Sequence, residues 1–116
     1  MEQLVLKTDI ENAEFYLASL AIGILDSMRT GEISLEVGIW SLARPTFWEP
    51  LEKSLKVSCK LVDWISSMDE LDALQELNGD ANRVIQETIE LLKLCQQDAL
   101  NSKPALVMSS KIEKSS

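Results

Sequence analysis

The stretch IENAEFYLASLAIGILDSMR, residues Ile10 to Arg29, decides the fold class of this chain. Its apolar residues recur at steps of three and four, the spacing of one helix face: Ala13, Leu17, Leu20, Ile24 and Met28. Between Phe15 and Leu25 the only polar residue is Ser19. A helix that is apolar on nearly all sides is buried on more than one of them. We therefore predict that residues 10–29 form the central helix of a helical fold.

Local signals define the ends of this helix and a contact surface on it. Asp9 is a candidate N-cap, and Gly31 follows Arg29 as a candidate C-terminal stop. Ser19 and Gly23 are small and lie four residues apart, which suits the close approach of another helix. We expect a neighbouring helix to pack closely at these two residues.

Four further helical segments follow from the pattern of apolar residues, prolines and capping residues. They are Leu35–Ala43 with Ser34 as N-cap, Pro50–Ser66 with Pro50 at its first position, Met68–Leu77 opened by a Ser67–Glu70 capping box, and Ala81–Gln97 with Asp80 as N-cap. Pro45 and Pro50 each restrict the preceding residue to extended geometry. We therefore expect Arg44–Glu49 to be an extended corner between two helices.

The last residues differ in composition from the rest. Residues 101–116, NSKPALVMSSKIEKSS, are rich in serine and lysine and are expected to form a flexible tail, within which the run ALVM could dock on the body. No internal repeat or low-complexity linker is present. The predicted fold is all-α: a single domain, residues 1–100, built as an irregular bundle of four to five helices.

The composition is that of an acidic globular domain. The 116 residues are 46% hydrophobic and 26% charged, which argues against wholesale disorder. No apolar run is long enough to cross a bilayer, and the start lacks a signal-peptide pattern, so we expect a cytoplasmic protein with no membrane partner. The net charge is −8, with nine acidic and two basic residues between positions 61 and 100. This balance argues against nucleic acid as a partner and favours a basic protein.

The sequence carries little catalytic or metal-binding chemistry. It has no histidine, which removes the commonest general base and most zinc sites. Cys59 and Cys95 lie in helical patterns, and we interpret both as small buried apolar residues. None of the four glycines belongs to a phosphate-binding loop. We expect no enzymatic activity, no metal and no cofactor; an enzyme that uses carboxylates alone is the remaining alternative.

An acidic band follows the predicted third helix. Its members are Asp69, Glu70, Asp72, Glu76 and Asp80, with Asp63 just upstream. The band is not a calcium loop, because the leucines within it keep helical spacing and no glycine falls at the turn position. One interpretation is a solvated helix face that keeps the protein soluble. The other is a docking face for a basic partner, such as a nuclease with a positive substrate site.

Three of the six aromatic side chains, Trp40, Phe47 and Trp48, lie at or just before the predicted corner, and Trp64 follows in the next predicted helix. In a core interpretation, Trp40 and Trp64 are buried, and Phe47 folds back on the following helix as a hydrophobic staple. In a binding interpretation, Arg44, Phe47 and Trp48 form a partner site, because tryptophan and arginine are enriched where proteins dock. The exposure of Trp48 and Arg44 decides between the two.

The stretch GILDSMRTGEISLEVGIWSLARPTFWEPLEK, residues Gly23 to Lys53, resembles a family of short, functionally uncharacterised bacterial all-helical proteins. The shared features are Leu25-Asp26-Ser27, Gly31, Ile33-Ser34, Pro45-Thr46 and the acidic stretch DELDALQEL. Arg44 stands where the family pattern has serine. The resemblance covers about residues 10–95 and implies a helical fold. Small acidic bacterial proteins of this kind resemble the immunity proteins encoded beside secreted toxins, which is an analogy of class.

The leading functional hypothesis is a non-enzymatic protein-binding module, with a toxin-neutralising immunity-type protein as its specific form. Docking would use the acidic band or the 44–49 corner. The alternative is a structural or regulatory homodimer without a toxin partner, in which the first helix or the aromatic corner pairs with a second copy.

Overall fold

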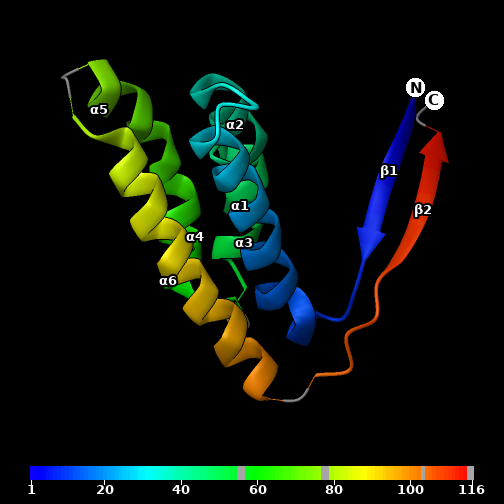
Figure 1. Ribbon diagram of the computed structural model, residues 1–116. Coiled ribbons are helices and arrows are strands. Elements are labelled where there is room, and N and C mark those ends of the chain that lie inside the picture. The colour runs from blue at the N-terminus through cyan, green and yellow to red at the C-terminus, as the bar shows by residue number, and fades with distance from the viewer. Residues whose placement is uncertain (55–56, 77–78, 103, 115–116) are drawn as a thin grey trace.

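The computed structural model describes residues 1–54, 57–76, 79–102 and 104–114, and in this part the chain forms a helical body with a two-stranded ribbon beside it (Figure 1). The elements in chain order are β1 (Glu2–Lys7), the 3₁₀-helix η1 (Ile10–Asn12), α1 (Ala13–Arg29), α2 (Leu35–Leu42), α3 (Pro45–Glu52), α4 (Cys59–Ser66), the 3₁₀-helix η2 (Ser67–Glu70), α5 (Leu71–Glu76), α6 (Ala81–Asn101) and β2 (Ser109–Lys114). The expectation of a predominantly helical chain is confirmed. A purely all-α fold is not, because of the sheet.

The central helix α1 follows the predicted pattern closely. It ends where the chain turns at Gly31, whose φ of +80° is a conformation that glycine adopts without a steric penalty. The Gly31 N–H donates to the Met28 carbonyl at 3.2 Å, so the predicted stop is confirmed. Asp9 makes no capping hydrogen bond through its side chain, and Asn12 occupies the N-cap position of α1.

The long helices α1 and α6 pack along one another. At this contact the Gln96 amide donates to the Ser19 hydroxyl at 2.7 Å. The expected close approach at Gly23 is wrong, since that residue is exposed and a Cβ placed on it would meet no atom within 4 Å. The small residues that α1 buries are Ala18 and Ala21, which lie on its inner face.

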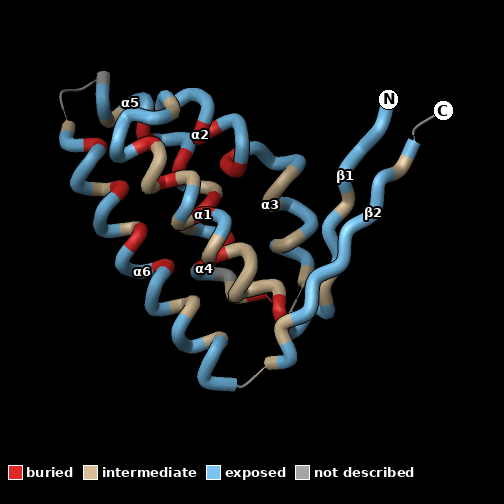
Figure 2. The backbone as a smooth tube through the Cα atoms, turned by 45° about the vertical axis from the view of Figure 1, so that its right-hand side comes forward, coloured by how far each residue is buried: buried red, intermediate tan, exposed pale blue. Residues whose placement is uncertain are grey.

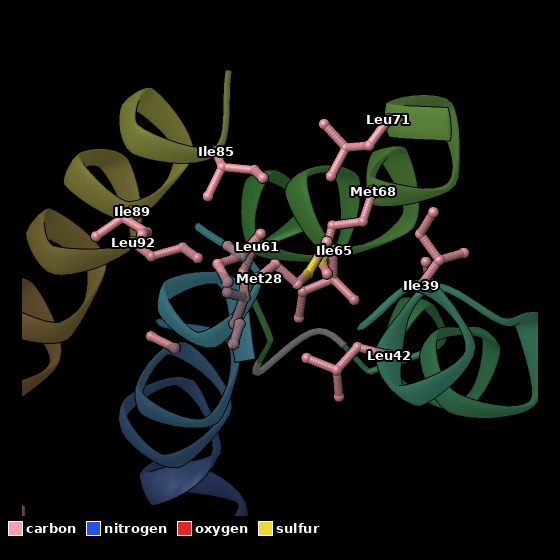
Figure 3. Close-up of a cluster of buried hydrophobic side chains, with 14 of the residues drawn as sticks. Met28, Ile39, Leu42, Leu61, Ile65, Met68, Leu71, Ile85, Ile89 and Leu92 are labelled. Atoms are coloured by element: carbon pink, nitrogen blue, oxygen red, sulfur yellow. The ribbon is translucent and has the colours of Figure 1, made fainter. Parts of the chain in front are cut away.

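The hydrophobic core lies between α1, α4 and α6 and extends under α2 and η2. Its largest fully buried side chains are Leu25 of α1, Leu61 and Ile65 of α4, and Ile85 and Leu92 of α6. Figure 3 shows Leu61, Ile65 and Met28 at the centre of this cluster. Burying one such side chain contributes about 1.5–3 kcal/mol, so this contact between distant segments holds the body together.

The segment that we expected to be an extended corner, Arg44–Glu49, is helical instead. Only Arg44 is extended, at ψ 145°, and Pro45 begins helix α3 as its first residue. Both Pro45 and Pro50 suit a first helical position, because their fixed φ is that of a helix. The helix begins at Pro45, and Pro50 lies inside it; both prolines are exposed. The missing N–H of Pro50 is tolerated in a helix of only eight residues.

The expected single helix from Pro50 to Ser66 is therefore also wrong. Helix α3 ends at Glu52, and α4 begins anew after Ser58. The Ser58 hydroxyl accepts from the Lys60 N–H at 3.2 Å. The Ser58 N–H itself donates to the carboxylate of Glu14 on α1. The first N–H groups of a helix have no partner within the helix. These two hydrogen bonds supply partners at Ser58 and Lys60, and this stabilises the beginning of α4 at this position.

The remaining helix boundaries are a mixture of confirmed and corrected predictions. Ser34 caps α2 by accepting from the Val37 N–H at 3.1 Å, and Asp80 caps α6 by accepting from the Arg83 N–H at 3.0 Å, both as expected. The predicted capping box is wrong, because Ser67 donates to the Trp64 carbonyl at 3.0 Å and continues the chain from α4 as the 3₁₀-helix η2. Residue 77, the expected end of the next helix, lies outside the described residues.

The two strands join the beginning and the end of the described chain. They pair antiparallel from Glu2 opposite Lys114 to Lys7 opposite Ser109. Strand β2 thus lies in the segment 101–116 that was expected to be a flexible tail. Figure 1 shows the ribbon standing beside the helices, and Figure 2 shows it almost wholly exposed. This pairing over a long sequence separation is what departs from the expected all-α fold.

Candidate protein-interaction surface

An exposed tryptophan and an arginine pair on the outer side of α2. The guanidinium carbon of Arg44 lies 4.1 Å from the ring centroid of Trp40, which is 60% exposed. The Ser34 cap starts α2 so that Ile39 and Leu42 face the core. Trp40 and Val37 then lie on the opposite side. The expectation that Trp40 is a core residue is therefore wrong.

The contact between the Arg44 guanidinium and the Trp40 ring holds the two side chains in position. An arginine over an indole ring is attracted to the π-electrons and contributes about 0.5–1 kcal/mol at an exposed site. Arg44 can hold this position because it precedes α3 as its extended N-cap residue and follows α2 by two residues. We call the outward residues of this region the Trp40 patch: Val37, Trp40, Ser41 and Arg44.

Phe47 and Trp48 serve the core more than the surface. Both are half-buried and pack against the hydrophobic cluster. The indole N–H of Trp48 donates to the Ala43 carbonyl at 3.1 Å, so its polar atom is satisfied within the chain. Trp64 is likewise half-buried against the core. Of the three residues predicted at the corner, Arg44 is thus the one whose side chain is exposed.

Three of the predicted acidic residues lie on elements that pack against α2. Asp69, Glu70 and Asp72 are exposed on η2 and α5, and α2 packs against both of these elements. Asp80 is exposed and its carboxylate caps α6. The side chain of Glu76 lies outside the described residues. Asp69, Glu70 and Asp72 thus lie on elements that pack against α2, the helix that carries Trp40.

A shallow hollow that the sequence did not indicate lies between η2, α5 and α6. It encloses about 440 Å³ and is lined by Ser67, Glu70, Leu71, Ala73, Leu74 and Val84. Its walls are mainly apolar, and Glu70, which also belongs to the acidic band, is among the lining residues. Helical periodicity predicts which side chains face inward but not how far two helices stand apart, so the sequence offers no signal for this hollow.

Cys95 lies in a second hollow, of about 310 Å³, together with Glu14, Lys60, Trp64 and Asp98. Burial, with the carboxylates of Glu14 and Asp98, raises the pKa of the Cys95 thiol, and Lys60 opposes this only in part. The thiol is therefore protonated at neutral pH and a poor nucleophile. The side chain of Cys59 lies outside the described residues.

The described residues hold no grouping for a metal ion and no helix that could cross a membrane. Across residues 1–54, 57–76, 79–102 and 104–114, no three side chains of the His, Cys, Asp and Glu types are grouped so that they could hold a metal ion. Within the same ranges, none of the helices combines the length and the apolar character needed to cross a bilayer.

The chain was compared with known proteins on the basis of its sequence and its fold. No protein-family model, no curated protein and no solved structure matches it.

Proposed function

We propose that this chain is a non-enzymatic protein-binding module whose main docking site is the Trp40 patch. The observation that carries the proposal is the position of Trp40, more than half exposed and stacked under Arg44. Tryptophan and arginine are the residues that most often dominate the binding energy of protein interfaces. A large ring that is already held in place loses little side-chain entropy when a partner covers it.

The charge of the elements that pack against α2 favours a basic partner. Asp69, Glu70 and Asp72 are exposed on the elements that pack against α2, and residues 61–100 carry nine acidic and two basic side chains. Such a field accelerates the approach of a positively charged protein and disfavours an acidic one. A nuclease with a positive substrate site is the partner class that this field suits. In that case the chain would be a toxin-neutralising immunity-type protein.

The test uses a photo-crosslinking amino acid placed at position 40 and, as a matched control, at position 94. Trp40 and Leu94 are both large, apolar and more than half exposed, but they lie on α2 and α6. We expect one protein to be crosslinked from position 40 and not from position 94 in the native cell. The crosslinked protein is then purified and its affinity for the chain measured.

In that binding measurement, Trp40→Ala should weaken the complex tenfold or more, which is about 1.4 kcal/mol, whereas Leu94→Ala should leave it unchanged. Equal crosslinking from both positions, or an affinity that does not respond to Trp40→Ala, would refute the Trp40 patch as the docking site. Replacement of Asp69 and Asp72 by asparagine should lower the association rate at low salt and have less effect at high salt.

A further inference from the structure

The β1–β2 ribbon has one apolar face that the helical body does not cover. Leu4 lies opposite Ile112 in the antiparallel pairing, and Leu6 follows two residues along on the same face. These three side chains are 63%, 60% and 57% exposed, respectively. The other face is polar, with an ion pair of 3.1 Å between Lys111 and Glu113 beside the half-buried Val5. The ribbon is therefore an amphipathic sheet of only two strands.

Such a sheet needs a further partner for its own stability. Two isolated strands are marginally stable in water, whereas three or more strands with a hydrophobic face are stable. At its base the ribbon is fixed, because the buried Asn12 amide donates to Thr8 Oγ1 at 2.9 Å and to the Ala105 carbonyl at 3.0 Å. Beyond this anchor most side chains of the two strands are exposed, while Val5 and Glu113 are half-buried.

The outer edge of β2 is the open one. Strand β2 lies on the side of the ribbon away from the helices in both views, and β1 lies between it and the body (Figure 1, Figure 2). An incoming strand therefore meets no helix of this chain when it pairs with β2. An unpaired strand edge of this kind offers a row of backbone N–H and C=O groups to another strand.

The sequence of β2 is self-complementary about one residue. In an antiparallel pair with a second copy, a two-fold axis at Ile112 places Ile112 opposite Ile112 of the second copy. Lys111 then lies opposite Glu113 of the second copy, and Glu113 opposite its Lys111. Opposite charges at directly facing positions stabilise a strand pair. A pairing displaced by one residue would put the apolar faces of the two ribbons on opposite sides of the sheet.

The edge of β1 offers no comparable arrangement. If β1 paired antiparallel with β1 of a second copy, a two-fold axis at Leu4 would place Glu2 opposite Leu6 of the second copy. A two-fold axis at Val5 would place Gln3 opposite Lys7 of the second copy. Neither creates a pair of opposite charges. Only the β2 edge therefore combines an apolar pair, two ion pairs and a shared apolar face.

The charge of the whole chain also favours contact at the ribbon. Two copies that each carry −8 repel one another, most strongly where residues 61–100 meet. The described ribbon holds Glu2, Lys7, Lys111, Glu113 and Lys114, so it carries more basic than acidic side chains. It is thus a part of the molecule where two copies meet without this repulsion.

We propose that the chain forms a dimer in which strand β2 pairs antiparallel with β2 of a second copy, centred on Ile112, to give a four-stranded sheet. Leu4, Leu6 and Ile112 of both copies then share one apolar face. This surface is distinct from the Trp40 patch, so the dimer does not depend on the proposed binding partner.

The test reverses the charges that face one another in the proposed β2–β2 pairing, which we call the seam. The dimer is measured by analytical ultracentrifugation of the full chain over a range of concentrations. Lys111→Glu alone sets glutamate against glutamate at both facing positions, and Glu113→Lys alone sets lysine against lysine. We expect each variant to dimerise about tenfold more weakly than the native chain, since two attractive pairs become two repulsive ones. An equimolar mixture of the two variants restores both attractive pairs and should form a heterodimer, identified by native mass spectrometry.

Lys7→Glu is the matched control, because it makes the same change of charge on the same ribbon, but on β1, away from the seam. It should leave the dimer unchanged. A native chain that stays monomeric at the highest concentration would refute the proposal. The proposal would also be refuted if the equimolar mixture of the two variants dimerised no better than either variant alone, or if Lys7→Glu weakened the dimer as much as Lys111→Glu does. A dimer insensitive to both seam charges would also refute it and would indicate packing through the Leu4 face. Circular dichroism of each variant checks that the fold is retained.

Discussion

The side-chain amide of Asn12 donates a hydrogen bond to the carbonyl oxygen of Ala105, 93 residues further along the chain, at 3.0 Å. The same nitrogen donates to Thr8 Oγ1, and that hydroxyl in turn donates to the Val107 carbonyl at 2.6 Å. Asn12 is 4% exposed, so its amide is withdrawn from water and depends on these partners. This small network is the joint between the helical body and the ribbon.

Replacing Asn12 by alanine should lower the free energy of unfolding by about 1–3 kcal/mol, because the Ala105 carbonyl loses its partner in a part-buried site. Urea denaturation measures this change. Backbone amides of β1 should also exchange with deuterium faster, while those at the centre of α1 keep their protection. Thr8→Val is the control for the second bond and should have a smaller effect. An Asn12→Ala protein with native stability and native exchange in β1 would contradict the role of this network.

Two glycines in helices should respond in opposite directions to the same substitution. A Cβ on Gly38 would overlap the buried side chain of Met28, whereas a Cβ on Gly23 meets open space. We expect Gly38→Ala to destabilise the protein by about 1–3 kcal/mol through overpacking. Gly23→Ala should stabilise it by about 0.5–1 kcal/mol, because alanine loses less backbone entropy in a helix. Thermal unfolding of both variants measures the difference, and a shift of the same sign in both would contradict the α1–α2 packing.

Trp40 and Trp48 should differ in what they contribute to stability. Trp40→Ala removes an exposed ring and its contact with Arg44, at a cost of about 0.5–1 kcal/mol. Trp48→Ala removes a half-buried ring with a satisfied N–H and should cost about 2 kcal/mol or more. Denaturation of the two variants under the same conditions tests this. Equal losses would mean that Trp40 is structural and would weaken the case for a docking surface there.

Cys95 should react slowly with alkylating reagents. Because burial and two carboxylates raise the pKa of its thiol, less of it is ionised at a given pH than in a free cysteine. Its reaction with iodoacetamide, followed by peptide mass spectrometry, should therefore remain slow until the pH rises above the usual range for thiols. Asp98→Asn removes one of the raising charges and should speed the reaction, whereas Lys60→Ala should slow it. A rate at pH 7 above that of glutathione would refute the assignment.

The parts of the fold that could be predicted are those encoded by a local pattern. The long periodic segments gave α1 and α6, and Ser34, Asp80 and Gly31 act through neighbours within a few residues. The corner could not be predicted, because Pro45 and Pro50 are equally suited to begin a helix and no local signal in the sequence chooses between them. The ribbon could not either, since neither strand has a partner near it in the sequence.

The candidate site also contains residues whose exposure could be predicted from the sequence and one, Trp40, whose exposure could not. Arg44, Asp69, Glu70, Asp72 and Asp80 are exposed, as charged side chains usually are. Trp40 was assigned to the core because large rings are more often buried, and here helical geometry overrode that tendency. It follows Ile39 by one residue, and a rotation of about 100° carries it away from the core-facing side of α2.

The Asn12 joint also implies an order of events in folding. We expect β1 and β2 to pair after α1 and α6 have aligned, because this alignment brings the residues near positions 12 and 105 together. Loop closure between β1 and β2 then spans a short distance instead of the whole chain, which lowers its entropic cost. The ribbon should therefore form last and open first, without loss of the helical core. We therefore expect the two ends of the chain to separate and pair again while the helical body remains folded.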